Sequence, residues 1–413
     1  MLNRCHLIAV VLIPAGTAPA SGQIPTVTLP EAIRRAERVQ PTVVRAIGEL
    51  HTAGARRRSA LGAYLPRLSA SSSASDFFSE GAARVDPVTG QLTSGNSSNR
   101  SLSTSLSASI DLFTGFRRGA EMRAARATEG ASEASLVDAR FQQALTTTNQ
   151  FLDALAAAQL LRVRETSVRR AEEQLKVSVA KLRAGSATRS DSLRSIVTLG
   201  NARLEQITTR AQLASAEANL ARLIGETGRV QAADDSAFYR LLPAIDTQAL
   251  RVEAESRSPR IQSAAAGAAA ARASARASRS AYWPSLTLAG NTGWNGSRVN
   301  DYDLLNQRQL SLSLRWNVFD GFERELAVAQ READLDLAEA SASDAQREVQ
   351  AELTTQLAEL DAARLRIEIS QTSVAAATED MRVQQERYRL GVSTIVDLLT
   401  SQEALNQAEV DVV

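Results

Sequence analysis

Cysteine and histidine are almost absent from this chain of 413 residues, which carries one cysteine and two histidines. Cys5 lies in a stretch that is typical of a cleaved secretory leader, so the remaining chain has no disulfide, thiolate ligand or cysteine nucleophile. His51 stands in a charged, helix-forming neighbourhood that indicates a solvated residue. We therefore expect no metal and no cofactor. An enzyme is the least favoured class, because no carboxylate pair or phosphate loop is recognisable.

Long apolar runs and an excess of one charge are also missing. The net charge is +1, so the composition lacks the excess of basic residues that is typical of nucleic-acid-binding proteins. The apolar run from Leu7 to Ile13 is too short to span a bilayer, which needs about 20 residues. With Arg4 before it and small residues up to Ala20 after it, residues 1–20 are predicted to be a signal peptide cleaved after Ala20.

Proline and glycine are scarce over long stretches. Proline is missing between Pro87 and Pro243 and after Pro284, and no glycine lies between Gly321 and Gly391. Because the two strongest helix breakers are absent, these stretches predict very long helices, with rods on the order of 100 Å for about seventy residues. A seven-residue apolar period predicts coiled-coil packing of these helices: Leu161, Val168, Leu175 and Leu182, then Leu353, Leu360, Ile367, Val374, Met381 and Tyr388.

The sequence contains an internal duplication. Residues 111–118 return as residues 317–324, and residues 182–191 return as residues 388–397, both at an offset of 206 positions. Earlier landmarks, such as Pro66 and Pro284, return at 218. We therefore divide the chain into an N-terminal segment (21–28), a first repeat (29–229), a linker (230–246) and a second repeat (247–413).

Each repeat carries two candidate strands. Apolar and polar residues alternate with a period of two, which predicts strands at about 66–78 and 101–113 in the first repeat and 284–294 and 309–319 in the second. Aromatic residues gather near the strand ends, where a transmembrane barrel has its interfacial girdles: Trp283, Trp294, Trp316, Phe113 and Phe319. The alternative is a soluble four-stranded sheet packed on helices. We favour the membrane, because soluble sheets seldom confine aromatics to strand ends.

Four strands cannot close a barrel. Strands in hydrocarbon must leave no open edge, and single-chain barrels begin at eight strands. The protomer is therefore expected to share its barrel with copies of itself. A closed, water-lined barrel continued by long helical rods is a conduit.

From about Leu29 onward, the chain resembles the TolC-like outer membrane efflux family. The resemblance rests on the duplication, the X-Pro openings of both repeats, the Phe-x-Gly strand exits and the Tyr-x-x-Gly to Asp tip in the second repeat. It implies a mainly α fold with a transmembrane β portion, in which a homotrimer forms a twelve-stranded barrel in outer membrane lipids and an α-helical tunnel in the periplasm. It also implies two partners, a periplasmic adaptor protein and an inner membrane transporter.

The resemblance also implies roles for single residues. Asp397 corresponds to a constriction aspartate of the periplasmic gate, and Thr400 stands where some members carry a second acid. Tyr388 and Asp191 resemble a pair that links neighbouring helical hairpins in the closed state. Ser393 replaces an arginine that reinforces this latch in some relatives. From the residues alone, Asp191 and Asp397 can equally serve to begin the returning helices.

The hairpin tips are where the family's adaptor docks, which singles out a set of tip residues: Gly185, Gly391, Leu182, Leu390 and Leu398. Relative to the first repeat, the final helix is expected to be truncated at Val413. The resulting hypothesis is a passive export duct for small molecules or secreted proteins. The alternative is a trimeric coiled-coil surface protein with no conducting lumen, which leaves the strands unexplained.

Overall fold

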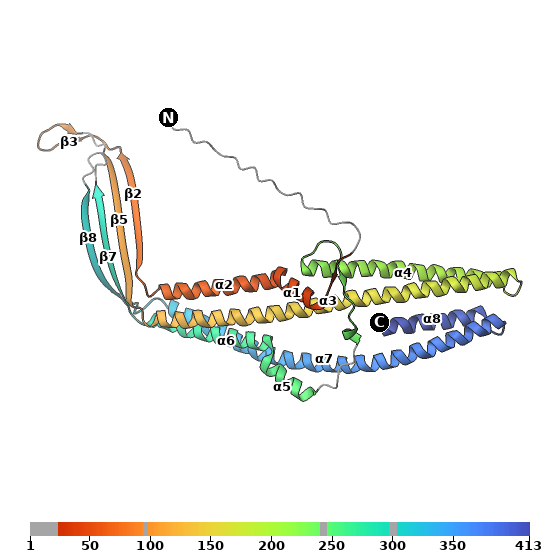
Figure 1. The fold of residues 1–413 in the computed structure, drawn as a ribbon. Coiled ribbons are helices and arrows are strands. Elements are labelled where there is room, and N and C mark those ends of the chain that lie inside the picture. Colours follow the sequence, from red (N-terminus) through yellow and green to blue (C-terminus); the bar gives the residue numbers. More distant parts are fainter. Residues whose placement is uncertain (1–23, 94–96, 240–245, 297–303) are drawn as a thin grey trace, which may run out of the picture. The chain divides into compact units, whose positions relative to one another are not determined.

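The computed structural model describes residues 24–93, 97–239, 246–296 and 304–413 (Figure 1). The expected signal peptide, with Cys5, lies outside the described residues, as does part of the expected linker. The chain forms two compact units, and each draws on both repeats. Unit 1 takes the described residues up to 36, 147–239 and 376–413, and unit 2 takes those of 37–146 and 240–375.

Helices make up most of the described chain, as the shortage of proline and glycine predicts. They are α1 (Leu29–Val39), α2 (Pro41–Gly62), α3 (Arg117–Arg183), α4 (Arg189–Ile224), α5 (Thr247–Arg257), α6 (Pro259–Ser278), α7 (Glu323–Leu390) and α8 (Ile395–Val412). The two long helices, α3 and α7, have 67 and 68 residues and occupy equivalent places in the two repeats. Proline stands at the first turn of α2 and α6, where its missing N–H costs no hydrogen bond.

A buried cluster in unit 1 joins the middle of α3 to the C-terminal end of α4. Phe151 of α3 and Leu220 of α4 are fully buried and pack with Val27 and Val230. Two short strands, β1 (Thr26–Val27) and β6 (Gln231–Ala232), pair in parallel beside this cluster. The N-terminal segment is thereby paired with the start of the linker that follows the first repeat.

Unit 2 contains a four-stranded antiparallel sheet with the order β2, β5, β7, β8 (Figure 1). Its strands are β2 (Arg67–Ser79), β5 (Ser97–Phe113), β7 (Ser285–Gly296) and β8 (Leu305–Arg315). A small hairpin of β3 (Arg84–Val85) and β4 (Leu92–Thr93) lies between β2 and β5 in the sequence. Two 3-10 turns, Ser236–Tyr239 and Arg279–Tyr282, complete the described elements. Strands β2 and β8 are the edges of the sheet.

The strand positions agree with the predicted ones within four residues, with one difference of substance. Strand β8 was expected to reach Phe319 but ends at Arg315. Its partner explains the early end, because Arg315 pairs with Ser285, the first residue of β7. Among the described residues, no strand pairs with positions beyond Arg315.

Each repeat leaves its sheet through a left-handed elbow. Gly115 and Phe116 have φ angles of 61° and 66°, and Gly321 and Phe322 both have 71°. Positive φ is rare for a residue as bulky as phenylalanine. Gly115 is also tightly enclosed, since a Cβ atom there would lie 2.5 Å from the Cβ of Trp283.

Replacing Gly115 by alanine should destabilise the fold, because the new methyl group meets Trp283 and the positive φ costs an L-residue about 1–2 kcal/mol. Gly130→Ala in α3 is the matched control, as open space surrounds that position and alanine is favoured in helices by about 0.5–1 kcal/mol. Circular dichroism should show a lower melting temperature for Gly115→Ala and an equal or higher one for Gly130→Ala. Equal melting of wild type and Gly115→Ala would contradict the tight elbow.

Candidate functional site

The two hairpin tips in unit 1 are built by the same local geometry. Gly185 and Gly391, with φ of 72° and 80°, end the long helices in the left-handed conformation that glycine adopts freely. Ser186 N–H donates to the carbonyl of Lys181 at 2.9 Å, and Val392 N–H donates to that of Arg387 at 3.0 Å. The sequence motif at the tips is therefore a helix stop followed by a helix start.

A capping box begins each returning helix. The Thr188 N–H donates to Asp191 at 2.8 Å, and the Asp191 N–H donates to the Thr188 hydroxyl at 3.3 Å. The same exchange joins Thr394 and Asp397. Both aspartates thus perform the local role of starting a helix, which satisfies amide groups that would otherwise lack partners.

Asp397 is exposed and holds more hydrogen bonds than its counterpart. Besides the Thr394 N–H at 3.0 Å, its carboxylate accepts from the hydroxyl groups of Thr394 at 2.8 Å and Ser393 at 3.1 Å. The Thr394 amide, followed by these hydroxyl groups, lowers the pKa of Asp397 below its ordinary value of 3.8. The side chain therefore stays charged at neutral and mildly acidic pH.

Tyr388 is 5% exposed and belongs to a cluster with Met381, Ile395, Leu398 and Leu405. Among the described residues its hydroxyl group has no hydrogen-bond partner. The Lys181 ammonium lies 4.3 Å from the centre of its ring and donates to its carbonyl oxygen. Burial, followed by the negative charge of Asp191, raises the pKa of Tyr388 above its ordinary value. The negative charge of Asp191 thus acts on the Tyr388 hydroxyl group, but among the described residues no hydrogen bond joins the two side chains.

The tip leucines differ in accessibility. Leu390 is 72% exposed and Leu182 is half-buried. Leu398 is 1% exposed, so its expected place on the docking surface is corrected: it lies in the tyrosine cluster, one turn inside α8, facing α7. Thr400 is exposed, and its hydroxyl donates to the Val396 carbonyl at 2.9 Å.

An apolar groove near the tips was not predicted from the sequence. It has a volume of about 560 Å³ and lies between α4 and α8. Leu193 and Val197 of α4 and Val396 of α8 line it with exposed side chains. Arg194 and Glu403 add one charge of each sign to the lining. The sequence does contain a sign of this groove, because apolar residues follow each capping box at positions that are exposed on the returning helices.

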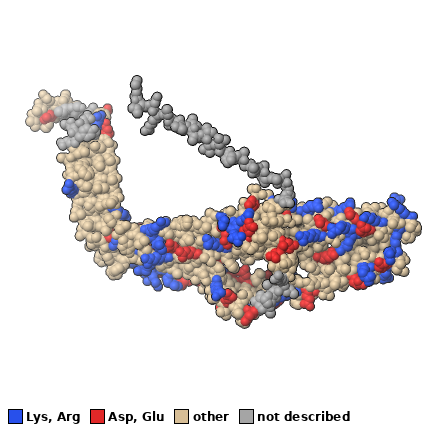
Figure 2. Space-filling view, in the orientation of Figure 1, with Lys and Arg blue, Asp and Glu red and all other residues tan. Residues whose placement is uncertain are grey.

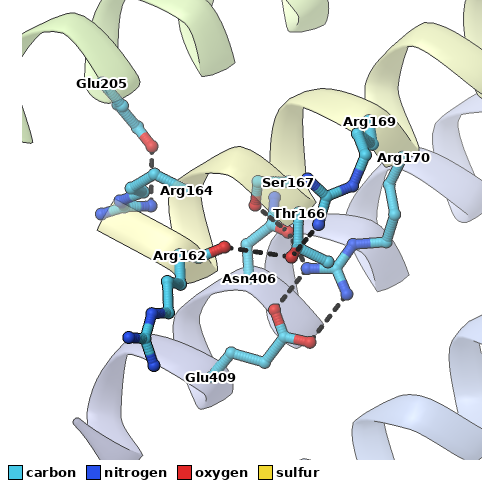
Figure 3. A network of polar contacts seen from close by, with 9 residues as sticks. All are labelled: Arg162, Arg164, Thr166, Ser167, Arg169, Arg170, Glu205, Asn406 and Glu409. Carbon is cyan, nitrogen blue, oxygen red and sulfur yellow. Dashed lines mark hydrogen bonds and ion pairs between the residues drawn. The ribbon is translucent and has the colours of Figure 1, made fainter. Parts of the chain in front are cut away.

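A polar network joins the two hairpins within unit 1 (Figure 3). The Ser167 hydroxyl of α3 donates to Asn406 Oδ1 of α8 at 2.6 Å. The Arg170 guanidinium binds both Asn406, at 2.9 Å, and the carboxylate of Glu409, at 2.7 Å. These partly buried, charge-assisted bonds fix the first-repeat hairpin against the second, because a two-pronged arginine contact constrains direction as well as distance.

The sheet in unit 2 has two chemically distinct faces. On one face, serine hydroxyls of β2 and β5 pair across the strands at 2.6–2.8 Å: Ser69 with Ser107, Ser71 with Ser105, Ser73 with Ser103 and Ser75 with Ser101. On the other face lie most of the leucines and the isoleucine of β5, β7 and β8, among them Ile110, Leu288 and Leu312 in one row, together with the hydroxyl pair of Ser72 and Thr104 at 3.0 Å. Charged side chains are sparse over the sheet and dense over the helices on the face shown in Figure 2.

Aromatic residues lie at the ends of these strands. Phe113 ends β5 and Trp294 lies near the far end of β7. Trp283 precedes β7, while Trp316 and Phe319 follow β8, so these three lie just outside the strands. Phe113 is partly buried. The other four are more than one-third exposed: Trp283, Trp294, Trp316 and Phe319.

Membrane-spanning helices and metal-binding clusters are both absent from the described residues. In the described ranges, the helices include none with an apolar stretch sufficient to cross a bilayer. Over the same residues, no group of three or more histidine, cysteine, aspartate or glutamate side chains gathers in a way that could hold a metal ion.

Comparison with known proteins gives matches at three levels. Residues 32–226 and 250–413 match the family described as outer membrane efflux protein. Protein CyaE of Bordetella pertussis is 28% identical over 297 residues, which are 70% of this chain and 62% of CyaE. The pyoverdine export outer membrane protein OpmQ of Pseudomonas aeruginosa is 25% identical over 321 residues, which are 77% of this chain and 67% of OpmQ. The chain therefore spans about two thirds or less of these relatives.

Among solved structures, the outer membrane protein VceC of Vibrio cholerae matches with a TM-score of 0.75. The match covers 93% of this chain and 91% of VceC at 18% sequence identity. At such low identity the likeness concerns the fold alone.

Proposed function

The chain belongs to the outer membrane efflux protein family, and on this premise we propose that it is the outer membrane channel of a tripartite export system. It forms a passive duct, from a periplasmic adaptor and an inner membrane transporter to the outside. The chain carries no nucleotide-binding motif, so the transporter supplies the energy.

The two-faced sheet with two open edges is the observation that carries this proposal. Its apolar face and terminal aromatics suit lipid, and its serine face suits water. Hydrocarbon does not tolerate the unpaired backbone groups of β2 and β8, so other copies must pair with them. Three copies of four strands make a twelve-stranded barrel, in keeping with the even strand numbers of such barrels. The helices then continue the water-filled path as a tunnel in the periplasm.

The periplasmic gate is proposed at the tips. Three copies of Asp397 form a ring of carboxylates that binds cations, and within each copy the Thr394 capping box lowers the pKa of Asp397 below its ordinary value, which favours the charged form. Thr400 adds no second charge to this ring. The buried Tyr388 hydroxyl, unpaired within the described chain, and the nearby Asp191 form the latch between hairpins.

Adaptor docking is proposed at the same end. Gly185, Gly391, Leu182 and Leu390 shape the tips, and the groove of Leu193, Val197 and Val396 supplies the apolar contact area. The cargo is a small molecule or a secreted protein. The name of OpmQ refers to pyoverdine export by that protein, and at 25% identity it assigns no cargo to this chain.

The channel is tested by single-channel recording of the purified protein in planar bilayers. Wild type should show small conductance steps that millimolar divalent cations block, at pH 7 and also at pH 5, because the pKa of Asp397 lies below 3.8. Asp397→Ala should raise the conductance and relieve the block by about tenfold or more, as the cation site is lost. Tyr388→Phe should raise the conductance without relieving the block.

Asp361→Ala is the matched control, because Asp361 is an exposed acid on α7 far from the tip in sequence. It should behave as wild type. Equal block in wild type and Asp397→Ala would reduce Asp397 to a helix start. The absence of any conductance from folded oligomers would favour a coiled-coil surface protein without a lumen.

A further inference from the structure

Four side chains of unit 1 carry buried polar atoms that have no hydrogen-bond partner among the described residues. The atoms are Gln174 Nε2, Gln402 Nε2 and Oε1, the Tyr388 hydroxyl oxygen and Arg170 Nε. Gln402 is 1% exposed, Tyr388 5% and Gln174 6%, so water at the surface does not reach these three side chains freely. Folded proteins seldom leave such groups unpartnered, because burial removes their hydration without replacing it.

The four side chains lie at one level of the contact between α3, α7 and α8. Helices α3 and α8 run in opposite directions, and Arg170 of α3 binds α8 (Figures 1 and 3). Gln174 follows Arg170 by about one turn, and Gln402 precedes the site of this contact on α8 by about one turn, so the two glutamines come level. Tyr388 packs with Leu398, which is one turn from Gln402. The unpartnered atoms therefore form one cluster.

A pocket with a volume of about 510 Å³ adjoins this cluster. Gln174 and Arg170 of α3 and Tyr388 of α7 line it, with Leu398 of α8 beside them. Three of the four side chains with unpartnered atoms thus border one cavity. Its volume lies within the range of small-molecule sites, which is about 300–1,000 Å³.

The lining of the pocket has one arginine more than its ion pairs use. Its two acids and two of its three arginines are paired: Arg170 with Glu409, Arg389 with Glu386, and Glu173 with Lys176. The third, Arg169, donates to the Thr166 hydroxyl at 2.7 Å and forms no ion pair within the described ranges. A positive charge beside unpartnered N–H and O–H groups favours a negatively charged ligand.

We propose that this pocket binds a small oxyanion, such as inorganic phosphate or the carboxylate of an organic acid. Arg169 supplies the charge, and the Gln174 amide and the Tyr388 hydroxyl donate hydrogen bonds to the oxygens. Gln402 offers a further donor and acceptor to water that accompanies the anion. Because the donors come from α3 and α7, the bound anion bridges the two hairpins.

The chemistry of the lining favours an oxyanion over other small ligands. Donors on separate helices suit a ligand with several oxygen atoms, and a planar guanidinium group matches two oxygens of a carboxylate or phosphate. A cation is disfavoured, because Glu173 and Glu386 are already paired with Lys176 and Arg389.

The pocket shares Tyr388 with the proposed latch, and in this respect the inference rests on the proposed function and deepens it. An anion that joins α3 to α7 holds the first-repeat hairpin to the second and thereby favours closed tips. Binding itself requires no lumen, so the site and the channel can be tested separately.

Thermal melting of the purified full-length protein in a non-ionic detergent tests binding. Phosphate or acetate replaces part of the sodium chloride in a Tris buffer at constant ionic strength. An oxyanion that binds the folded state should raise the melting temperature by about 2–4 °C relative to chloride. Phosphate and acetate in separate samples show which oxyanion the pocket takes. No shift with either would overturn the site and leave a pocket filled by water.

Variants separate binding from the general stabilisation that phosphate gives by exclusion from protein surfaces. Arg169→Gln removes the charge, and Gln174→Leu removes the amide donor at similar size. Both should lose the shift or require at least about tenfold more oxyanion for half of it. Arg366→Gln is the matched control, because Arg366 is an exposed arginine of α7 outside the pocket. It should respond as wild type does.

Melting without an oxyanion shows whether Gln174 serves the fold instead. Gln174→Leu should then melt at the wild-type temperature or above, because an apolar group replaces a buried amide nitrogen that lacks a partner. A lower melting temperature together with an unchanged oxyanion shift would make Gln174 a structural residue. Equal shifts in wild type, Arg169→Gln and Gln174→Leu would overturn the site, since surface exclusion acts on all of them alike.

Single-channel recording tests the role of the anion at the latch. The oxyanion that binds should lower the open probability of wild type by about fivefold and leave that of Arg169→Gln unchanged. Binding with no effect on the open probability would overturn the role at the latch and keep the site. If folded protein shows no conductance at all, the channel proposal fails, while the melting experiment still decides whether the oxyanion binds.

Discussion

The backbone groups along the open edges of β2 and β8 are the constraint on which the rest of the structure depends. A strand edge in lipid leaves amide and carbonyl groups unpaired at a cost of several kcal/mol each. A chain with four strands cannot remove its two edges alone. Under the proposed function, assembly is a condition for this sheet to exist in a membrane, and a lumen follows from the proposed assembly, because the serine face is enclosed when the edges of the copies meet.

The internal duplication allows one repeated unit to form the whole sheet. One unit of two strands and a helical hairpin supplies the pairing of β2 with β5 and of β7 with β8, and its repetition sets β5 against β7. The same unit supplies both tips, each with a left-handed glycine and a capping box. The two halves differ where they meet: Gly115 is closed by Trp283, while Gly321 stays open. The first elbow is thus enclosed by another segment of the chain, whereas the second is open among the described residues.

Much of the fold could be predicted from the sequence, because periodicity and helix breakers act locally. The missing prolines and glycines indicated α3 and α7, and the alternation of apolar and polar residues indicated the four strands. The prediction that Asp191 and Asp397 can begin the returning helices is confirmed, and the structure adds their capping boxes with Thr188 and Thr394. What failed depended on contacts between distant segments. Leu398 was placed on the surface although α7 covers it, and β8 was drawn longer than its partner within the chain allows.

In the proposed channel one face of the sheet meets water and the other meets lipid, and the accessibility of side chains along β5 distinguishes this arrangement from a sheet outside the bilayer. Single cysteines at Ser103, Thr104, Ser105 and Leu106, in the Cys5→Ser background, would be labelled in native outer membranes with a membrane-impermeant thiol reagent. The account predicts labelling with a period of two, rapid at positions 103 and 105 and slow at 104 and 106. Uniform labelling would contradict it, because both faces of a sheet outside the bilayer are open to water.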